Sequence, residues 1–222
     1  MPRVCPDCPA VRGPRPAFEG LVQRESGCAF RCLAVPARQP LPERWRADYG
    51  FALVRRGIVV RQRVDSTGRA TSIDIAGPGS ALPIGAEADD GAGGYAVDDV
   101  MLCLCPTSSL DAAVASGAAG ARDVVNAQAT ILRRVERIAE ARSRASATSR
   151  VAAMLLAIGD TLSPGRALNI IPSAIQQRDL ASLLALRHES VCRSVASLEE
   201  KHLVQRGDSG LTLVDRRALE VL

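Results

Sequence analysis

Seven cysteines are the residues of this 222-residue chain best suited to redox or metal chemistry. Cys5 and Cys8 form a Cys-x-x-Cys pair within a proline-rich segment, which is not the pattern of a packed core. An odd number of cysteines argues against a disulfide framework, and residues 1–8 lack the apolar stretch of a secretory signal. The Cys5–Cys8 pair therefore favours metal binding or thiol redox chemistry.

A second set of polar side chains lies on a predicted helix over residues 188–202, opposite its apolar stripe. This set consists of His188, Glu189, Cys192 and Arg193. Arginine can donate two hydrogen bonds to guanine, and glutamate can accept one from the cytosine amino group. The neighbouring Arg187 and Ser190 are suited to phosphate contacts, which position a helix without reading sequence.

Two of these residues also allow a purely structural interpretation. Glu189 and Arg193 are four residues apart, so an intrahelical ion pair is the alternative to base contacts. Cys192 is equally well interpreted as a small buried hydrophobic residue.

Secondary-structure elements that would position this helix are predicted directly before and after it in the sequence. Residues 177–184 show helical apolar spacing and are separated from 188–202 by only three residues, which favours a helix-turn-helix. A β-hairpin over 203–206 and 211–214 follows as a wing. The shared core of the two helices is predicted to consist of Leu180, Ala181, Leu184, Val191, Val195 and Leu198.

The first half of the chain has a different residue pattern. Short apolar stretches alternate with turn residues, which predicts strands over 51–54, 58–64, 70–75, 95–97 and 100–105. Such regularly spaced strands favour a small antiparallel barrel or roll. Hydrophobic residues make up 47% of the chain but aromatic residues only 3%, so the core must be aliphatic.

Between these regions, the residues of one mainly apolar stripe recur at alternating spacings of four and three positions. This heptad pattern predicts one long helix. Its stripe is widened by Leu132 and Ala139. The stripe either packs on the chain's own roll or pairs with a second copy, and we expect a homodimer. The predicted dimer interface consists of Val124, Gln128, Ile131, Val135, Ile138 and Arg142.

The predicted fold class is therefore α+β, with an N-terminal antiparallel β-roll, a long dimerisation helix and a C-terminal winged helix-turn-helix. The predicted boundaries are an arm over 1–20, the roll over 21–110, the helix over 111–146 and the winged domain over 147–222. Residues 121–222 hold 15 basic and 11 acidic residues, so the net charge of +4 lies in this half and suits an anionic partner. No apolar run is long enough to span a membrane.

The chain resembles the Crp/Fnr superfamily of bacterial transcription regulators. The resemblance rests on the order of the elements and on residues 177–204 (QRDLASLLALRHESVCRSVASLEEKHLV), in which Glu189-Ser190-Val191-Cys192-Arg193 matches the family's Glu-[Thr/Ser]-x-x-Arg motif. Segments 49–57 and 73–83 also resemble its sensor roll. The resemblance departs at Ala185, where the family usually has glycine, and at Ser194, which takes a usually apolar position. It implies a cytoplasmic homodimer that binds double-stranded DNA and contacts RNA polymerase.

Members of the superfamily respond to different effectors. Those that bind cyclic AMP carry an arginine-containing phosphate cassette in the roll. The matching segment here, residues 79–95, has no Arg or Lys but holds Glu87, Asp89 and Asp90. A phosphate placed there would face negative charge without a bidentate donor, so we expect no cyclic nucleotide.

The cysteines instead resemble those of the oxygen-sensing branch, the fumarate-nitrate regulators. That branch holds a [4Fe–4S] cluster with three N-terminal cysteines and one in the roll. The resemblance implies the ligands Cys5, Cys8, Cys28 and Cys103, with Cys32 and Cys105 as alternates. A third cysteine close after Cys8 is missing, so a structural zinc site, a thiol switch and no metal at all stay open.

An enzyme is the rival class, for example a thiol oxidoreductase built on Cys5 and Cys8. The chain has only two histidines, His188 and His202, and both lie in the predicted helix-turn-helix region. No nucleophile, base and carboxylate can be assembled into a catalytic set, so we expect no enzymatic activity.

Overall fold

The computed structural model describes residues 30–42, 48–84, 92–115, 117–163 and 169–222. These residues form two compact units. Unit 1 consists of the described residues up to Arg61 and from Ala76 to Arg133, and unit 2 of Gln62–Ile75 and the described residues from Arg134 onward. In this grouping, residues 62–75 go with the C-terminal part of the chain. The predicted arm over residues 1–20 lies outside the described residues.

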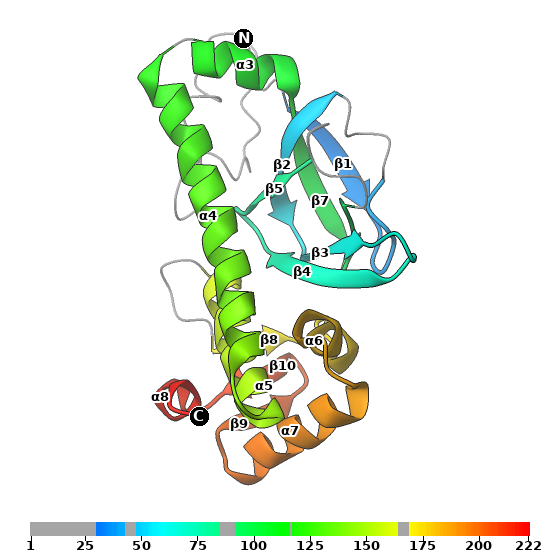
Figure 1. Cartoon of the computed structure of the whole chain (residues 1–222), viewed down its shortest axis with the longest axis vertical. Coiled ribbons are helices and arrows are strands. Elements are labelled where there is room, and N and C mark those ends of the chain that lie inside the picture. Colours follow the sequence, from blue (N-terminus) through cyan, green and yellow to red (C-terminus); the bar gives the residue numbers. More distant parts are fainter. Residues whose placement is uncertain (1–29, 43–47, 85–91, 116, 164–168) are drawn as a thin grey trace. The chain divides into compact units, whose positions relative to one another are not determined.

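The roll consists of seven strands within the described residues, in two sheets (Figure 1). One sheet has the order β1-β7-β2-β5 with antiparallel pairs, and the other has the order β4-β3-β6. All five predicted strands are present, and the prediction missed β1 and β5. The strands are β1 (Arg31–Val35), β2 (Tyr49–Arg56), β3 (Val59–Val64), β4 (Ala70–Ala76), β5 (Ala81–Pro83), β6 (Ala92–Ala96) and β7 (Val100–Pro106).

The strands β2 and β7 are buried on both faces, which explains their continuous apolar sequences. On the inner face, residues such as Ala52, Val54 and Leu102 form the core of the roll. On the outer face, a second apolar cluster joins the sheet to a helix of the same unit. Its buried members are Phe51, Leu53, Ala81, Cys103, Cys105, Ala127 and Ile131.

The predicted long helix is two helices, α3 (Thr107–Ala115) and α4 (Ala118–Ser143). Gly117, directly before α4, has φ +128°, a conformation that L residues rarely adopt. The 26 residues of α4 include the whole predicted heptad stripe up to Arg142.

Three residues of the predicted dimer interface make contacts or are buried within the chain itself. Ile131 is buried against the outer face of the sheet, and Ile138 is only 2% exposed. Arg142 donates from Nε to Leu183 O at 2.7 Å and from Nη2 to Ser72 O. These three side chains therefore have little surface left for a second copy of the chain.

Unit 2 contains the C-terminal helices and a three-stranded sheet of order β8-β10-β9 (Figure 1). Helix α5 begins after Ser146, whose Oγ accepts from Ser149 N at 3.0 Å as an N-cap. At Gly210, with φ +139°, an added Cβ would lie 1.9 Å from Ile171 O, so the wing requires glycine there. The elements are α5 (Ala147–Leu162), β8 (Ile170–Pro172), α6 (Gln177–Leu184), α7 (His188–Glu200), β9 (Val204–Gly207), β10 (Gly210–Leu213) and α8 (Arg216–Glu220).

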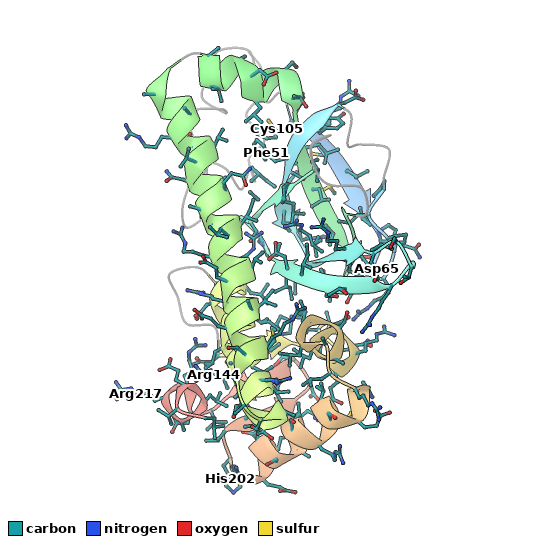
Figure 2. The ribbon with its side chains drawn as sticks, in the orientation of Figure 1. Phe51, Asp65, Cys105, Arg144, His202 and Arg217 are labelled. Atoms are coloured by element: carbon teal, nitrogen blue, oxygen red, sulfur yellow. The ribbon has the colours of Figure 1, made fainter. Side chains whose placement is uncertain are left out.

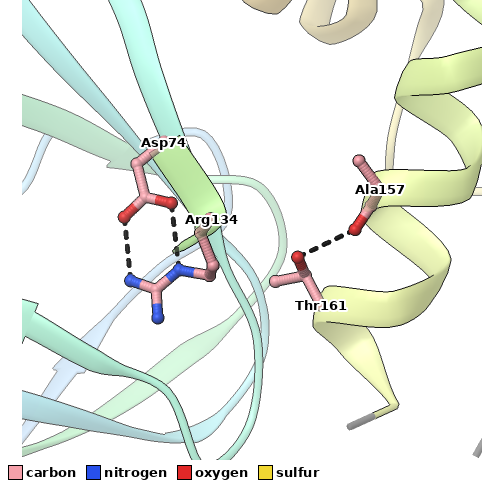
Figure 3. A network of polar contacts seen from close by, with 4 residues as sticks. All are labelled: Asp74, Arg134, Ala157 and Thr161. Carbon is pink, nitrogen blue, oxygen red and sulfur yellow. Dashed lines mark hydrogen bonds and ion pairs between the residues drawn. The ribbon is translucent and has the colours of Figure 1, made fainter. Parts of the chain in front are cut away.

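The hairpin of β3 and β4 is held in unit 2 by polar contacts. Arg134 of α4 donates from Nε and Nη2 to the two carboxylate oxygens of Asp74, at 3.0 and 2.8 Å (Figure 3). Asp74 is fully buried and Arg134 is 6% exposed. Further along β4, Ser72 Oγ lies 2.5 Å from Ser182 Oγ of α6. The hairpin is therefore joined to both α4 and α6.

The tip of the hairpin is a turn closed by its own side chains. Asp65 accepts from the hydroxyl and the backbone N–H of Thr67 and from Arg69 N. The hydrogen bond from the Thr67 hydroxyl and those from the two backbone groups lower the pKa of Asp65 below its ordinary value.

Removing one partner of the buried Asp74–Arg134 pair leaves a buried charge without its counter-ion. We expect Asp74→Ala to lower the free energy of unfolding of unit 2 by about 3–5 kcal/mol. Urea denaturation followed by circular dichroism measures this loss. The matched control is Glu199→Ala at the exposed Glu199–Arg206 pair, where Arg206 is 62% exposed. That control should cost less than about 1 kcal/mol, and equal losses at the two sites would contradict this account.

Candidate DNA-binding interface

The two predicted helices of the helix-turn-helix are α6 and α7. They are joined at Ala185, which adopts the left-handed conformation with φ +52° and ψ +40°. Leu186 N donates to Ala181 O at 3.0 Å and Ala185 N donates to Ser182 O at 3.3 Å, which closes the end of α6 in a Schellman motif. The turn therefore requires at position 185 a conformation that glycine adopts at lower cost than alanine.

The apolar face of the two helices is buried as predicted. Its predicted members are between 0 and 8% exposed: Leu180, Ala181, Leu184, Val191, Val195 and Leu198. Ser194 shares this face and is also buried, at 3%. The buried stripe fixes which side of α7 remains open to solvent.

The open side of α7 carries most of the predicted DNA-contacting residues. Arg187, His188, Glu189 and Arg193 are exposed, and Ser190 is half-buried. Arg187 is the N-cap residue of α7, so the set occupies the first turns of the helix. A helix that enters the major groove by its N-terminal end presents base-contacting side chains from these turns.

The alternative structural interpretations can be compared with the geometry. No ion pair joins Glu189 to Arg193, both of which the structure describes, so their side chains stay available for other partners. Cys192 is half-buried and its thiol donates to Gln177 Oε1 at 2.7 Å, with His188 Nδ1 at 3.6 Å. This thiol links α7 to the start of α6.

A groove beside α7 brings together further polar residues that the sequence analysis missed. The groove, about 400 Å³ in volume, is lined by residues of α6, α7 and the wing, among them Gln177, Arg178, His188 and Arg206. Arg178 is exposed at the start of α6, and Arg206 lies on β9 with an ion pair to Glu199 at 3.2 Å. The run Gln176-Gln177-Arg178 at the start of a predicted helix was the available signal.

The predicted metal ligands are only partly within the described residues. Cys5, Cys8 and Cys28 lie outside them. The alternates and the internal ligand lie on the sheet: Cys32 of β1 is exposed, whereas Cys103 and Cys105 of β7 are buried. Within the described ranges, no group of three or more His, Cys, Asp or Glu residues could hold a metal ion.

The described thiols therefore fit only part of a cluster site. Cys32 and Cys103 are direct partners in the β1–β7 register and share one face of the sheet, which gives two adjacent sulfur ligands. A [4Fe–4S] cluster requires four ligands, so Cys5, Cys8 or Cys28 would have to supply the rest. The register favours Cys32 at least as much as Cys28, which the sequence analysis preferred.

Comparison with known proteins identifies the C-terminal part of the chain. Residues 149–222 match the family model of the Crp-like helix-turn-helix domain. None of the curated proteins matches the chain. None of the helices in the described part of the chain is long and apolar enough to cross a membrane.

Solved structures share the fold over most of the chain. FixK2 from Bradyrhizobium japonicum is 22% identical with a TM-score of 0.73, over 87% of this chain and 96% of FixK2. TTHB099, a CRP-family transcriptional regulator from Thermus thermophilus, is 18% identical with a TM-score of 0.62, over 85% of this chain and 95% of TTHB099. A mutant of CooA from Carboxydothermus hydrogenoformans is 15% identical with a TM-score of 0.65, over 87% of both chains.

The chain thus has the fold of Crp/Fnr regulators, an antiparallel N-terminal sheet domain followed by helices and a Crp-like helix-turn-helix. The family match assigns a Crp-like helix-turn-helix domain to residues 149–222, which include α6, α7 and the wing.

The left-handed conformation of Ala185 predicts a gain in stability from glycine. We expect Ala185→Gly to raise the free energy of unfolding by about 0.5–1 kcal/mol, because the Cβ strain is removed and only part of the gain is offset in the unfolded chain. The control is Ala196→Gly, at an exposed right-handed position inside α7, which should lower it by about 1 kcal/mol. Chemical denaturation measures both, and a loss at position 185 would contradict the expectation.

Proposed function

We propose that the protein is a sequence-specific DNA-binding transcription regulator that reads its site with the N-terminal turns of α7. The observation that carries this proposal is the division of α7 into a buried apolar face and an open face with Glu189 and Arg193. In this proposal Arg193 donates to guanine and Glu189 accepts from a cytosine amino group. His188 and Ser190 flank these contacts at the same end of the helix.

Phosphate contacts are assigned to the basic residues around this end of α7. Arg187 caps the helix, Arg178 lies at the start of α6, and Arg206 lies on the wing. The last two line the groove beside α7. Such contacts fix the orientation of the helix on the duplex but carry no sequence information directly.

We assign the dimer contact to the exposed apolar stripe of α4, with a second copy of the chain as its occupant. Val125 is 65% exposed and Leu132 is 57% exposed. With Gln128 and Val135 of the original prediction, they follow the three-and-four spacing of a coiled-coil seam. Two copies joined in this way would present two recognition helices to half-sites about one helical turn apart.

We further propose that the roll senses oxygen or redox state through its cysteines, with a [4Fe–4S] cluster as the group held. Cys103 would be the ligand from the roll, and it belongs to the same buried apolar cluster as Ala127 and Ile131 of α4. A change at its sulfur alters the packing of the helix that carries the dimer stripe. The other ligands would come from Cys5, Cys8 and either Cys28 or Cys32.

In this proposal the protein acts in the cytoplasm, where it binds DNA and contacts RNA polymerase. The proposal assigns no catalytic residues to it. The segment proposed to lack a cyclic-nucleotide site, residues 79–95, is described only in part, since residues 85–91 lie outside the described ranges.

If Arg193 contacts a base, its removal should lower the affinity for the specific DNA site more than the affinity for other DNA. We expect Arg193→Ala to weaken binding to a selected duplex by about 1–3 kcal/mol and to weaken binding to a random duplex much less. Fluorescence anisotropy at fixed salt measures both affinities. Arg217→Ala, which removes the same charge from the exposed surface of α8, is the matched control and should leave the selected duplex bound. Equal losses on both duplexes would show that Arg193 contacts the backbone instead.

The cluster proposal predicts iron and sulfide in protein purified without oxygen. We expect about four iron and four sulfide per chain and a thiolate-to-iron charge-transfer absorption, both lost in Cys103→Ser. Cys192→Ser, which changes a thiol of unit 2, should keep the iron. Expression with both iron and zinc supplied separates a zinc site from a cluster by metal analysis. Colourless, iron-free protein that binds its selected duplex normally would overturn the sensing proposal.

A further inference from the structure

A pair of thiols lies on the outer face of the four-stranded sheet of the roll. In the antiparallel register of β1 and β7, Cys32 is the direct partner of Cys103. Both side chains carry reduced thiols. Directly opposed residues of antiparallel strands point to the same face of the sheet, with Cβ atoms about 4.5–5.5 Å apart.

The neighbouring side chains confirm which face the pair occupies. Cys103 is the partner of Leu53 and Cys105 the partner of Phe51 in the β2–β7 register, and all four belong to the outer apolar cluster. Phe30, two residues before Cys32, packs against the same cluster with its ring centroid 6.2 Å from that of Phe51. The alternation of strand side chains therefore places Cys32 beside Cys103 on this face.

The two thiols differ in their access to solvent. Cys32 is exposed, whereas Cys103 is 4% exposed. Cys105, on the same face of β7, is 1% exposed and lies beside Phe51 in the register (Figure 2). An oxidant in solution can therefore reach Cys32 first, and the thiol placed to react next is that of Cys103.

We propose that Cys32 and Cys103 form a reversible intrachain disulfide when the protein meets a hydroperoxide. The thiolate of Cys32 attacks the peroxide, so the O–O bond breaks and Cys32 becomes a sulfenic acid, with release of hydroxide from hydrogen peroxide or of an alkoxide from an alkyl hydroperoxide. The thiol of Cys103 then attacks this sulfur, forms the S–S bond and releases water. Two thiols lose two electrons and two protons in total, and one hydroperoxide is reduced by two electrons.

The geometry of the strands permits this bond. A disulfide joins Cβ atoms about 3.5–4.5 Å apart, so the opposed pair needs to approach by about 1 Å. Strand β1 is at the edge of its sheet and pairs there only with β7 among the described strands. It can therefore move toward β7 without breaking a second ladder.

The disulfide would have one chemical consequence for the roll. It uses the sulfur of Cys103, so the bond and metal binding at Cys103 exclude each other. The inference does not require the proposed cluster, because both thiols are present in the metal-free chain.

The test uses full-length protein freed of iron with a chelator, so that its outcome is separate from that of the cluster proposal. The reduced protein is treated with hydrogen peroxide, alkylated, digested with trypsin and mapped by mass spectrometry without reduction. Trypsin releases Cys32 in the peptide 32–38, apart from Cys28, and releases Cys103 with Cys105 in the peptide 70–122. We expect the amount of the two peptides joined by a disulfide to be at least about tenfold higher than in the untreated protein. Adding a dithiol should separate them.

Two variants identify the partners. Cys32→Ser, an exposed position, should abolish the joined peptide, whereas Cys105→Ser should keep it within about twofold. If a variant fails to fold, fragmentation of the joined peptides from the unaltered protein assigns the bond to Cys103 or to Cys105. Cys32 joined to another cysteine, Cys32 oxidised to sulfinic acid with Cys103 still alkylated, or loss of the joined peptide in Cys105→Ser would each overturn the proposal.

Discussion

The bidentate ion pair between Asp74 and Arg134 is the contact on which unit 2 depends for its internal arrangement. Asp74 is fully buried, and both of its oxygens accept from one guanidinium. A buried pair of this kind contributes geometric definition more than net stability, because desolvation offsets much of the attraction. It fixes β4 against α4, and this position brings Ser72 to Ser182 of α6.

Arg142 extends the same arrangement to the end of α6, before the turn that leads into α7. Its guanidinium donates to Leu183 O, in the last turn of α6, and to Ser72 O of β4. Burial lowers the pKa of Arg142 below its ordinary value, yet arginine remains charged at neutral pH. The C-terminal end of α6, which leads into the left-handed Ala185, is thus held by groups that come from α4 and from the β3–β4 hairpin. The side of α7 that faces solvent follows from these contacts together with the apolar stripe.

Local patterns predicted the helix-turn-helix in detail, because three residues between two amphipathic helices leave little conformational choice. The exposure of His188, Glu189 and Arg193 followed from the position of Val191 and Val195 on the opposite face. The dimer stripe stays a prediction. Heptad spacing does not distinguish a helix that packs on its own sheet from one that pairs with a copy, and α4 does the former at Ile131.

The remaining features depend on contacts that are distant in sequence. The pairing of Cys32 with Cys103 requires the β1–β7 register, and β1 carries too little alternation to be recognised as a strand. The bonds from Arg142 span 41 and 70 residues, and a charged residue at a seam position gives no sign of such partners. Arg178 and Arg206 meet at one groove only after α6 and the wing have folded together.

The central claim is that two copies of α7 read DNA from their exposed first turns, and in vitro selection from a random duplex library with the purified protein tests it most directly. We predict enrichment of a two-fold symmetric site, with half-site centres about 10 base pairs apart and a G·C pair in each half. Selection of no sequence, or of a single site without symmetry, would contradict this account.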